Sequence, residues 1–421
     1  MSLKPKNYMP RLIDKNISNL MDVAGAISIE GPKWCGKTYT SLAYANSAVN
    51  MDDRETRERF ELNSDLILND EKPELIDEWT REPEVWDKVR RKCDELQTKG
   101  NYILSCSTSL NKNNEEVFHS GAGRIVKTKM STMSLYETGD STGEISIMDM
   151  YNGKEKNITT KRPTLEELAN FIVRGGWPAN LNVSKEKAGI LPKAYINNVL
   201  DKDIYDDKNR DRHKMEMLLK SLARNESTIV TNNTLIRDIS DFENYEIDKN
   251  TVSDYLNVLE RLYLVNDTPS YSENYRSPER VGKNPKRHLV DPSLPCALMN
   301  LNTEKLVKDL RTFGLFFEAL VEHDLDIYMT YLGGKLYHFR DNVTGQEVDA
   351  ILEFEDGEYA AAEIKLGFNQ FEEAKNNLVD FASKMKKKPK FMCVIAGYND
   401  VIARDKETGV YVVPITALKA E

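Results

Sequence analysis

A glycine-rich turn near the N-terminus limits what this chain can fold into more than any other feature. It fits the phosphate-loop pattern G-x-x-x-x-G-K-[ST], and its residues are Gly31, Pro32, Lys33, Trp34, Cys35, Gly36, Lys37 and Thr38. The apolar run from Ala26 to Ile29 precedes the turn and is typical of a buried strand, and the residues after Thr38 predict a helix. A strand, this turn and a helix in that order predict an α/β fold that binds a nucleoside triphosphate.

The residue types of the turn suit phosphate chemistry. Glycines let the backbone curl so that successive N–H groups face one concavity, and the start of the following helix also favours an anion. We expect Lys37 to reach the β and γ phosphates of ATP and Thr38 to place its hydroxyl in the shell of a bound Mg²⁺. Tyr39 comes next and is expected to contact the nucleotide as well. A chance glycine-rich turn between a strand and a helix is the alternative interpretation.

An acidic signature follows further along the chain. A short apolar run after Pro73 ends in Asp77 and Glu78, at the end of a predicted strand, where open α/β sheets collect their ligands. We expect Asp77 to hold Mg²⁺ through water and Glu78 to orient the hydrolytic water, which makes Glu78, with Lys37, a candidate catalytic residue. The alternative is a solvated strand end that happens to carry two acids.

Two further side chains are candidates for sensing the charge of the nucleotide. A helix is predicted over 84–99 and an apolar strand over 101–108, which ends in hydroxyls; Ser107, or less favourably Ser105, is expected to hydrogen-bond to the γ-phosphate. A core strand that runs into a serine-rich turn is the alternative. Arg124 follows two glycines and is predicted to act as an arginine finger on the nucleotide of a neighbouring subunit, although an exposed arginine without that role is common in such loops.

Length and composition indicate an ordinary multidomain protein. A chain of 421 residues is expected to form two to four domains. No apolar run approaches the roughly 18 residues of a membrane span, and no signal peptide is apparent, so cytoplasm is the expected compartment and no membrane contact is expected. The cysteines are odd in number and far apart, which argues against a disulfide framework or a cysteine zinc site; they are Cys35, Cys93, Cys106, Cys296 and Cys393.

The middle of the chain has the rhythm of a winged helix-turn-helix. A helix is expected over 214–225, two more over 234–239 and 250–259, and the segments 262–265 and 288–290 would flank a wing. The last of these helices mixes acids and an amide with two basic residues, which are Lys249, Asp254, Asn257, Glu260 and Arg261. Because this face is not basic and the net charge is −10, a structural or protein-contact role is favoured over sequence-specific DNA reading. The basic run Lys283 to Arg287 is the reservation.

The C-terminal part predicts a second α/β domain. Its expected elements are a helix over 312–325, strands over 336–340, 347–354, 359–366 and 391–395, and a helix over 370–384. Asp349 and Glu363 fall on adjacent strands, and Lys365 shares a face with Glu363 because side chains alternate along a strand. Such a group could bind Mg²⁺ and activate a water for phosphodiester cleavage. A half-exposed strand with alternating charge is the alternative.

The chain as a whole resembles a known family. The residues that carry the resemblance are the loop from Gly31 to Thr38 and the runs Ile76 to Trp79, Met133 to Glu137 and Arg174 to Pro178. Together they resemble the prokaryotic AAA-type ATPases that end in a restriction-nuclease-like domain. The resemblance implies a RecA-like αβα P-loop ATPase core (1–160), a helical lid or linker (161–205), a winged-helix domain (206–295) and a restriction-nuclease-like domain (296–421).

The resemblance also bears on single residues. It adds Glu318, in the leading helix of the last domain, to Asp349, Glu363 and Lys365 as a second metal site. One departure concerns the sensor strand, which is expected to end in Thr-Gly-Ser in such chains and here ends in Ser105, Cys106 and Ser107.

The sequence leaves three functions open. The first is an Mg-dependent ATPase whose nucleotide state moves the other domains, in a homo-oligomer that supplies Arg124. The second is an ATP-gated nuclease or DNA-binding protein. The third is a nucleotide-dependent switch that binds a protein partner and has no nuclease activity, which the acidic balance favours over the second.

Overall fold

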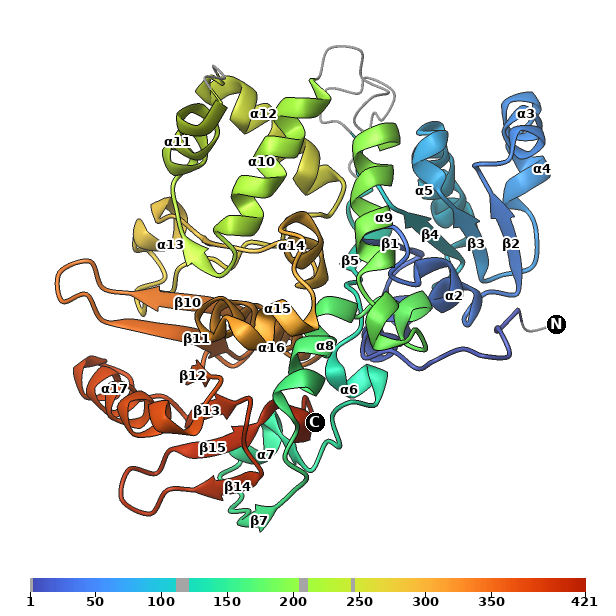
Figure 1. Cartoon of the computed structure of the whole chain (residues 1–421). Coiled ribbons are helices and arrows are strands. Elements are labelled where there is room, and N and C mark those ends of the chain that lie inside the picture. The colour runs from blue at the N-terminus through green and yellow to red at the C-terminus, as the bar shows by residue number, and fades with distance from the viewer. Residues whose placement is uncertain (1–2, 111–120, 204–210, 244–246) are drawn as a thin grey trace. The chain divides into compact units, whose positions relative to one another are not determined.

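The computed structural model describes residues 3–110, 121–203, 211–243 and 247–421, and they form two compact units (Figure 1). Unit 1 comprises Met1–Thr132 and Leu259–Leu264, and unit 2 comprises Met133–Val258 and Val265–Glu421. No helix in the described part of the chain combines the length and the apolar character that crossing a bilayer requires.

Unit 1 is built on a five-stranded sheet in which every pair is parallel. Its strands are β1 (Ala26–Glu30), β2 (Ser47–Asn50), β3 (Glu74–Asp77), β4 (Tyr102–Cys106) and β5 (Ile125–Lys129). The order is β2-β3-β4-β1-β5, so β1 lies in the interior of the sheet with β4 and β5 as its neighbours. The expected strand before the glycine turn and the expected strand over 101–108 are confirmed as β1 and β4.

Both faces of this sheet are buried, as parallel sheets require. Ile27 and Ile29 of β1 join one apolar cluster with Ile17, whereas Ala26 joins a second cluster with Trp86 on the other face. The helices of unit 1 are α1 (Ile13–Val23), α2 (Lys37–Leu42), α3 (Arg54–Leu62), α4 (Asp65–Leu68) and α5 (Glu84–Leu96). The helix expected over 84–99 is confirmed as α5, so the sequence period predicted this layer correctly.

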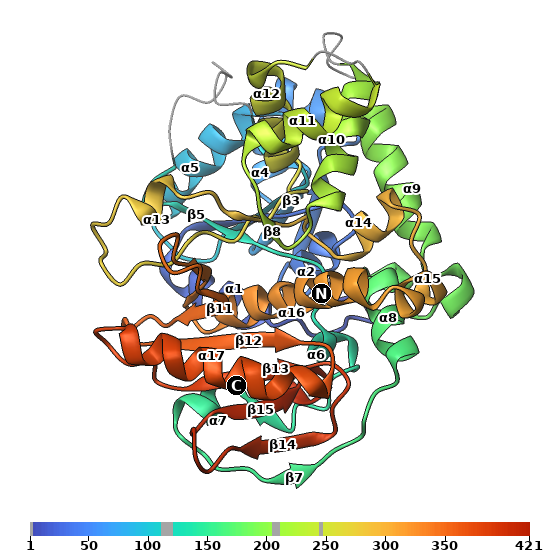
Figure 2. The ribbon, with the colours of Figure 1, turned by 60° about the vertical axis from the view of Figure 1, so that its left-hand side comes forward.

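Unit 2 contains a seven-stranded mixed sheet in the order β10-β11-β12-β13-β15-β14-β7. The strands are β7 (Ile158–Thr159), β10 (Lys335–Arg340), β11 (Glu347–Glu353), β12 (Tyr359–Lys365), β13 (Met392–Ala396), β14 (Val401–Arg404) and β15 (Tyr411–Pro414). Helices α16 (Leu310–Tyr331) and α17 (Phe371–Lys384) pack against it, and Figure 2 shows α17 lying along the strands. All strands and helices expected for the C-terminal part are confirmed.

The middle of the chain is mainly helical. Its elements are α8 (Leu165–Arg174), α9 (Ile190–Asn198), α10 (Arg212–Arg224), β8 (Thr228–Ile229), α11 (Asn232–Glu243), α12 (Lys249–Arg261), α13 (Glu279–Gly282), β9 (Lys286–Arg287), α14 (Ser293–Leu298) and α15 (Thr303–Lys308). Strands β8 and β9 pair antiparallel, and Val265 forms an isolated antiparallel bridge with Leu289. The helices expected over 214–225, 234–239 and 250–259 are therefore present as α10, α11 and α12.

Residues 133–160, which the sequence groups with the ATPase core, lie in unit 2. They contain α6 (Leu135–Thr138), β6 (Ile145–Ser146), α7 (Ile147–Tyr151) and β7. Strand β7 pairs with β14, and β6 pairs with β16 (Leu418–Lys419). The difference arises because the partners of these strands lie more than 240 residues further along the chain, for example Ile402 opposite Ile158.

Candidate active site

The loop between β1 and α2 needs its two glycines for different reasons. A Cβ on Gly31 would lie 2.1 Å from the backbone oxygen of Met130, so no side chain fits there. Gly36 has φ of +105°, a conformation that only glycine adopts without strain, and it leads directly into α2. Trp34 also has a positive φ, of 66°, within the same turn. The backbone therefore takes the tight curl that the sequence pattern predicts.

Arg11 braces this loop from a distant part of the sequence. Its Nη1 donates to the Cys35 carbonyl at 2.9 Å, and its Nη2 donates to the carbonyls of Ser131 and Thr132 at 2.9 and 3.1 Å. The side chain is almost completely buried, and its guanidinium group donates to backbone oxygens of the loop and of the segment after β5. No motif marks an isolated arginine before a helix, and sequence reasoning missed it.

Lys37 is buried against its own loop. Its Nζ donates to the carbonyl oxygens of Gly31 and Pro32 at 2.9 and 2.8 Å, and the residue is only 6% exposed. The ammonium group is therefore held at the loop, where an anion bound by the loop would meet it. Cys35 is fully buried, whereas Trp34 and Tyr39 are 43% and 58% exposed and leave aromatic surface beside the loop.

The first residue of the acidic signature lies beside Thr38. Asp77 ends β3, and its Oδ2 accepts a hydrogen bond from the Thr38 hydroxyl at 3.0 Å. Its other oxygen, Oδ1, accepts from the Ser105 hydroxyl on β4. The Asp77 carboxylate is thus held between α2 and β4 by hydroxyl donors.

These oxygens are of the hard kind that Mg²⁺ binds. The Thr38 and Asp77 oxygens are 3.0 Å apart, and both are hard oxygen donors. The residues present therefore fit Mg²⁺ bound together with a nucleotide.

Glu78 has an unusual backbone and a defined partner. Its φ and ψ are 51° and 41°, in the left-handed region that costs a non-glycine residue energy. The carboxylate accepts from the Ser107 hydroxyl at 2.8 Å and from the Ser107 backbone N–H at 3.3 Å. The two residues that the sequence assigned to water activation and phosphate sensing are thus in direct contact.

Arg124 lies at the end of the strands opposite the phosphate loop. It immediately precedes β5, whose first residue, Ile125, pairs with Ala26 at the start of β1. Its Nε donates to Asp94 Oδ1 at 2.7 Å. The loop after β1 lies a whole strand away, roughly 16 Å for five residues, so Arg124 does not reach the loop of its own unit.

A second set of polar residues surrounds the end of β1 in unit 1. Glu30 is 7% exposed, and its carboxylate accepts from the Tyr263 hydroxyl at 2.8 Å and pairs with Lys127 at 2.7 Å. Tyr263 belongs to the short segment that follows α12, and burial beside Cys106 and Glu30 raises the pKa of its hydroxyl. Ser109 N–H also donates to the carbonyl of Arg261 at 2.9 Å. Hydrogen bonds therefore hold the end of α12 and the segment after it beside Glu30, the residue that immediately precedes the loop.

The acids expected for the second metal site lie close together, but lysines are their partners. Lys365 Nζ lies 2.9 Å from Asp349 Oδ2 and 2.6 Å from Glu363 Oε2. Glu318 pairs instead with Lys286, at 2.5 Å. Burial, with the neighbouring Asp349 carboxylate, raises the pKa of Glu363, and the pKa of Lys365 is raised by these two acids against the effect of burial. Within the described residues, no group of three or more His, Cys, Asp or Glu side chains is placed to hold a metal ion.

The basic run at Lys283 to Arg287 is not an exposed cationic surface. Lys286 and Arg287 are 6% and 8% exposed, and Arg287 donates to Asp267 and Asn232. Two charges of this run are therefore engaged in internal contacts, which argues against DNA binding by the run.

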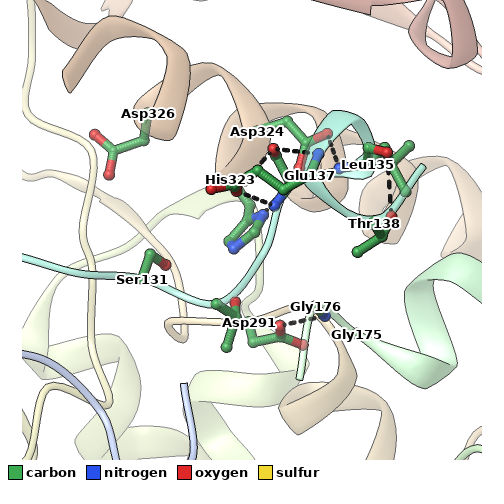
Figure 3. A network of polar contacts seen from close by, with 12 residues as sticks. Ser131, Leu135, Glu137, Thr138, Gly175, Gly176, Asp291, His323, Asp324 and Asp326 are labelled. Atoms are coloured by element: carbon green, nitrogen blue, oxygen red, sulfur yellow. Dashed lines mark hydrogen bonds and ion pairs between the residues drawn. The ribbon is translucent and has the colours of Figure 1, made fainter. Parts of the chain in front are cut away.

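The two other runs that carry the family resemblance have structural contacts in unit 2 (Figure 3). Met133 N–H donates to the Gly176 carbonyl at 2.8 Å, and a Cβ on Gly176 would lie 2.0 Å from the Met133 oxygen. Gly176 N–H donates to Asp291 Oδ2 at 2.9 Å, and Leu135 N–H donates to the buried Asp324 at 2.9 Å. These runs therefore fold against each other and against the buried carboxylates of Asp291 and Asp324.

Three family models match successive parts of the chain. Residues 24–139 match a model described as an AAA domain. Residues 165–305 and 313–418 match two domains of unknown function, DUF8612 and DUF4143. The chain therefore carries an AAA-type P-loop domain. The match begins just before β1 and includes the loop, Asp77, Glu78 and Ser107.

Comparisons with whole proteins are less informative. No curated protein matches the chain. Among solved structures, the Walker-type ATPase PABY2304 of Pyrococcus abyssi is 11% identical with a TM-score of 0.44 and aligns over 71% of this chain and 98% of its own. The RuvB Holliday junction branch migration motor of Thermotoga maritima is 13% identical with a TM-score of 0.28, over 64% and 94% of the two chains. AMPPCP-bound DnaA from Aquifex aeolicus is 13% identical with a TM-score of 0.27, over 59% and 86%. At TM-scores below 0.5, these likenesses carry no argument about activity.

Proposed function

We propose that the chain binds ATP with Mg²⁺ at the loop between β1 and α2 and hydrolyses it. Residues 31–39 surround the polyphosphate, and Lys37 provides the positive charge for the β and γ phosphates. Thr38 would hold Mg²⁺ through its hydroxyl and Asp77 would hold it through water, and the ion would neutralise part of the phosphate charge. The AAA domain match over residues 24–139 supports nucleotide binding.

Glu78 is the residue we assign to the attacking water. Its carboxylate lies at the end of β3 next to Asp77, and Ser107 donates two hydrogen bonds to it. A carboxylate held in this way can orient a water and polarise it. Ser107 then links the water-orienting group to the strand end that would face the γ-phosphate.

The contact between Thr38 and Asp77 carries this proposal, because it joins the phosphate loop to the acidic signature and brings together two oxygen donors that suit Mg²⁺. Calorimetry with ATP and Mg²⁺ tests it. Wild type and Lys99→Ala, which removes an exposed lysine, should bind, whereas Lys37→Ala should lose at least about 10-fold in affinity because charged hydrogen bonds contribute about 1.5–3 kcal/mol. A Lys37→Ala protein that binds and hydrolyses ATP like wild type would overturn the assignment.

The nucleotide state is expected to act on the helices of the middle segment. We assign α10, α11 and α12 with β8 and β9 to a winged helix whose role is structural or a protein contact. Tyr263, which follows α12, donates a hydrogen bond to Glu30, the residue immediately before Gly31. A change in the loop on ATP hydrolysis would therefore reach the end of α12 through two residues. The internal pairing of Lys286 and Arg287 favours a protein partner over DNA.

For the C-terminal part we keep the proposal of a restriction-nuclease-like fold over 296–421. The proximity of Asp349, Glu363 and Lys365 supports it. The alternative function, an ATP-gated nuclease, would use these residues, and it predicts Mg-dependent DNA cleavage that Lys365→Ala abolishes while the ATPase survives. Absence of cleavage by wild type with any divalent metal would eliminate it.

We also propose that Arg124 acts on the nucleotide of a neighbouring subunit in a homo-oligomer. Its place at the end of the strands opposite its own loop supports an action between subunits. Sedimentation with and without ATP tests this: an unchanged mass distribution would contradict it.

A further inference from the structure

Lys286 places a positive charge in the middle of a buried acidic cluster in unit 2. Its Nζ lies 2.5 Å from Glu318 Oε1, 2.8 Å from Glu322 Oε1 and 3.3 Å from the Asp349 backbone oxygen. The residue is 6% exposed. This buried ammonium ion has three oxygen neighbours, and oxygens are also the ligands that hard metal cations take.

This lysine is built into the fold rather than reaching in from the surface. Strand β9 holds its backbone, since Lys286 and Thr268 exchange two hydrogen bonds of 2.9 Å and Lys286 pairs with Ile229 of β8. The next residue, Arg287, is fixed by Asp267 and Asn232. The ammonium group is therefore delivered by the middle of the chain to acids on α16.

A histidine completes the cluster. His288 Nδ1 lies 3.0 Å from Glu226 Oε1, and its Nε2 lies 3.1 Å from Glu322 Oε2. Glu322 thus accepts a hydrogen bond from Lys286 on one oxygen, and its other oxygen lies within ion-pair distance of His288. The remaining pair of acids, Asp349 and Glu363, shares the ammonium group of Lys365.

We infer that the ammonium group of Lys286 occupies the position of a divalent cation in the acidic centre formed by Glu318, Glu322 and the Asp349 carbonyl. The cluster carries its own cation, so it takes up no Mg²⁺ or Mn²⁺. Its role is to join β9 to α16 and β11 through buried charge. This inference is independent of the proposed ATPase, because it concerns residues of unit 2 alone and is tested without nucleotide.

Replacing the lysine should convert the cluster into a metal site. Lys286→Ala removes the ammonium group that Glu318 and Glu322 share and leaves space for an ion, so the variant should melt at a lower temperature in EDTA. Mn²⁺ should then raise the melting temperature by about 5 °C, because a ligand that binds only the folded state stabilises it. Lys286→Met removes the charge but fills the space, so it should melt lower and gain nothing from Mn²⁺. Lys286→Ala with Glu318→Gln should also lose the response.

Thermal unfolding in EDTA and in Mn²⁺, without nucleotide, distinguishes the outcomes. Every variant also carries Asp77→Asn, which removes the expected metal ligand of the phosphate loop, so a response belongs to unit 2. A Lys286→Ala protein that is as stable as wild type, or that Mn²⁺ does not stabilise, overturns the inference. If Lys286→Ala does not fold, Mn²⁺ paramagnetic resonance on protein with wild-type Lys286 decides: a bound ion that Glu318→Gln abolishes contradicts the inference, and its absence supports it.

Discussion

Carboxylates gather in both units, at strand ends in unit 1 and on α16, β11 and β12 in unit 2, but their partners differ. In unit 1, Asp77 and Glu78 accept hydrogen bonds from the hydroxyls of Thr38, Ser105 and Ser107. In unit 2, Asp349 and Glu363 share Lys365, and Glu318 and Glu322 share Lys286. The first set is neutral apart from the acids themselves, whereas the second contains its own counterions.

This difference separates a site that can take a ligand from one that is already occupied. A hydroxyl that donates to a carboxylate can turn to accept or to bind a metal, because its proton rotates and the net energy of the exchanged hydrogen bond is about 1 kcal/mol. Removing a lysine from a buried acid costs about 3–5 kcal/mol, because the acid is left charged without a partner. A strand end rich in acids is therefore a better candidate for a metal when its neighbours are hydroxyls.

Asp77 and Glu78 with their hydroxyl donors form a hydroxyl-rich centre, and the largest expected effect falls there. Glu78→Gln should retain ATP binding and lower kcat by about 1000-fold, because the amide keeps the contact with Ser107 but cannot polarise the water. Steady-state hydrolysis and calorimetry measure the two quantities separately. Glu84→Gln, which neutralises an exposed acid at the start of α5, is the matched control and should hydrolyse normally. Equal hydrolysis by Glu78→Gln and wild type would show that the water is oriented elsewhere.

The acids of unit 2 and their partners Lys286 and Lys365 form a lysine-rich centre. Substitutions in this centre should change the stability of the folded protein. Lys365→Met should lower the free energy of unfolding by about 3 kcal/mol, because Asp349 and Glu363 then lose the cation that contacts both carboxylates. Urea denaturation in EDTA, followed by a probe of unit 2, checks this. Lys384→Met is the control, since its partner Asp380 is 55% exposed and such surface pairs contribute at most about 1 kcal/mol. Equal losses in the two variants would remove the contrast between the centres.

Local patterns predicted much of this molecule. The loop from Gly31, the strand ending at Asp77 and the helices α16 and α17 were predicted from spacing and period, because each depends on residues close in sequence. The family models for residues 165–305 and 313–418 name no function, so the winged helix and the nuclease-like fold stay predictions.

The contacts that sequence reasoning missed all join distant residues. Arg11 reaches Ser131 and Thr132 across about 120 positions, and Lys286 reaches Asp349 across 63. A buried ion pair requires only that two side chains meet in the fold, so it leaves no period and no spacing in the sequence. Lys286 therefore looked like one charge of an exposed basic wing, although it is internal.

A histidine near the lysine-rich centre extends the comparison to pH. Burial, with Lys286 nearby, lowers the pKa of His338 from 6.5 to about 4. The folded state thus prefers the neutral ring, so its contribution to stability is present above pH 6.5 and is lost as the pH falls from there towards 4. At pH 5 the penalty is about 2 kcal/mol.

His338→Gln removes this titration. The difference in unfolding free energy between wild type and His338→Gln should therefore move by about 2 kcal/mol in favour of the variant between pH 7.5 and pH 5. Denaturation at the two pH values measures it. A difference that stays constant across this range would mean that the ring is not buried in its neutral form.

The smallest effect concerns the contact between Ser107 and Glu78. Ser107→Ala removes the hydroxyl donor but keeps the backbone N–H donor at 3.3 Å, so the carboxylate loses one of its two partners. A hydrogen bond to a charged group contributes about 1.5 kcal/mol, which corresponds to a fall in kcat of about 10-fold, with little change in the affinity for ATP. Thr108→Ala, at the next position, should leave kcat unchanged. If Ser107→Ala instead weakens ATP binding and spares kcat, the hydroxyl acts on the phosphate in the ground state, and the hydroxyl partners of this centre do exchange between the acid and the ligand.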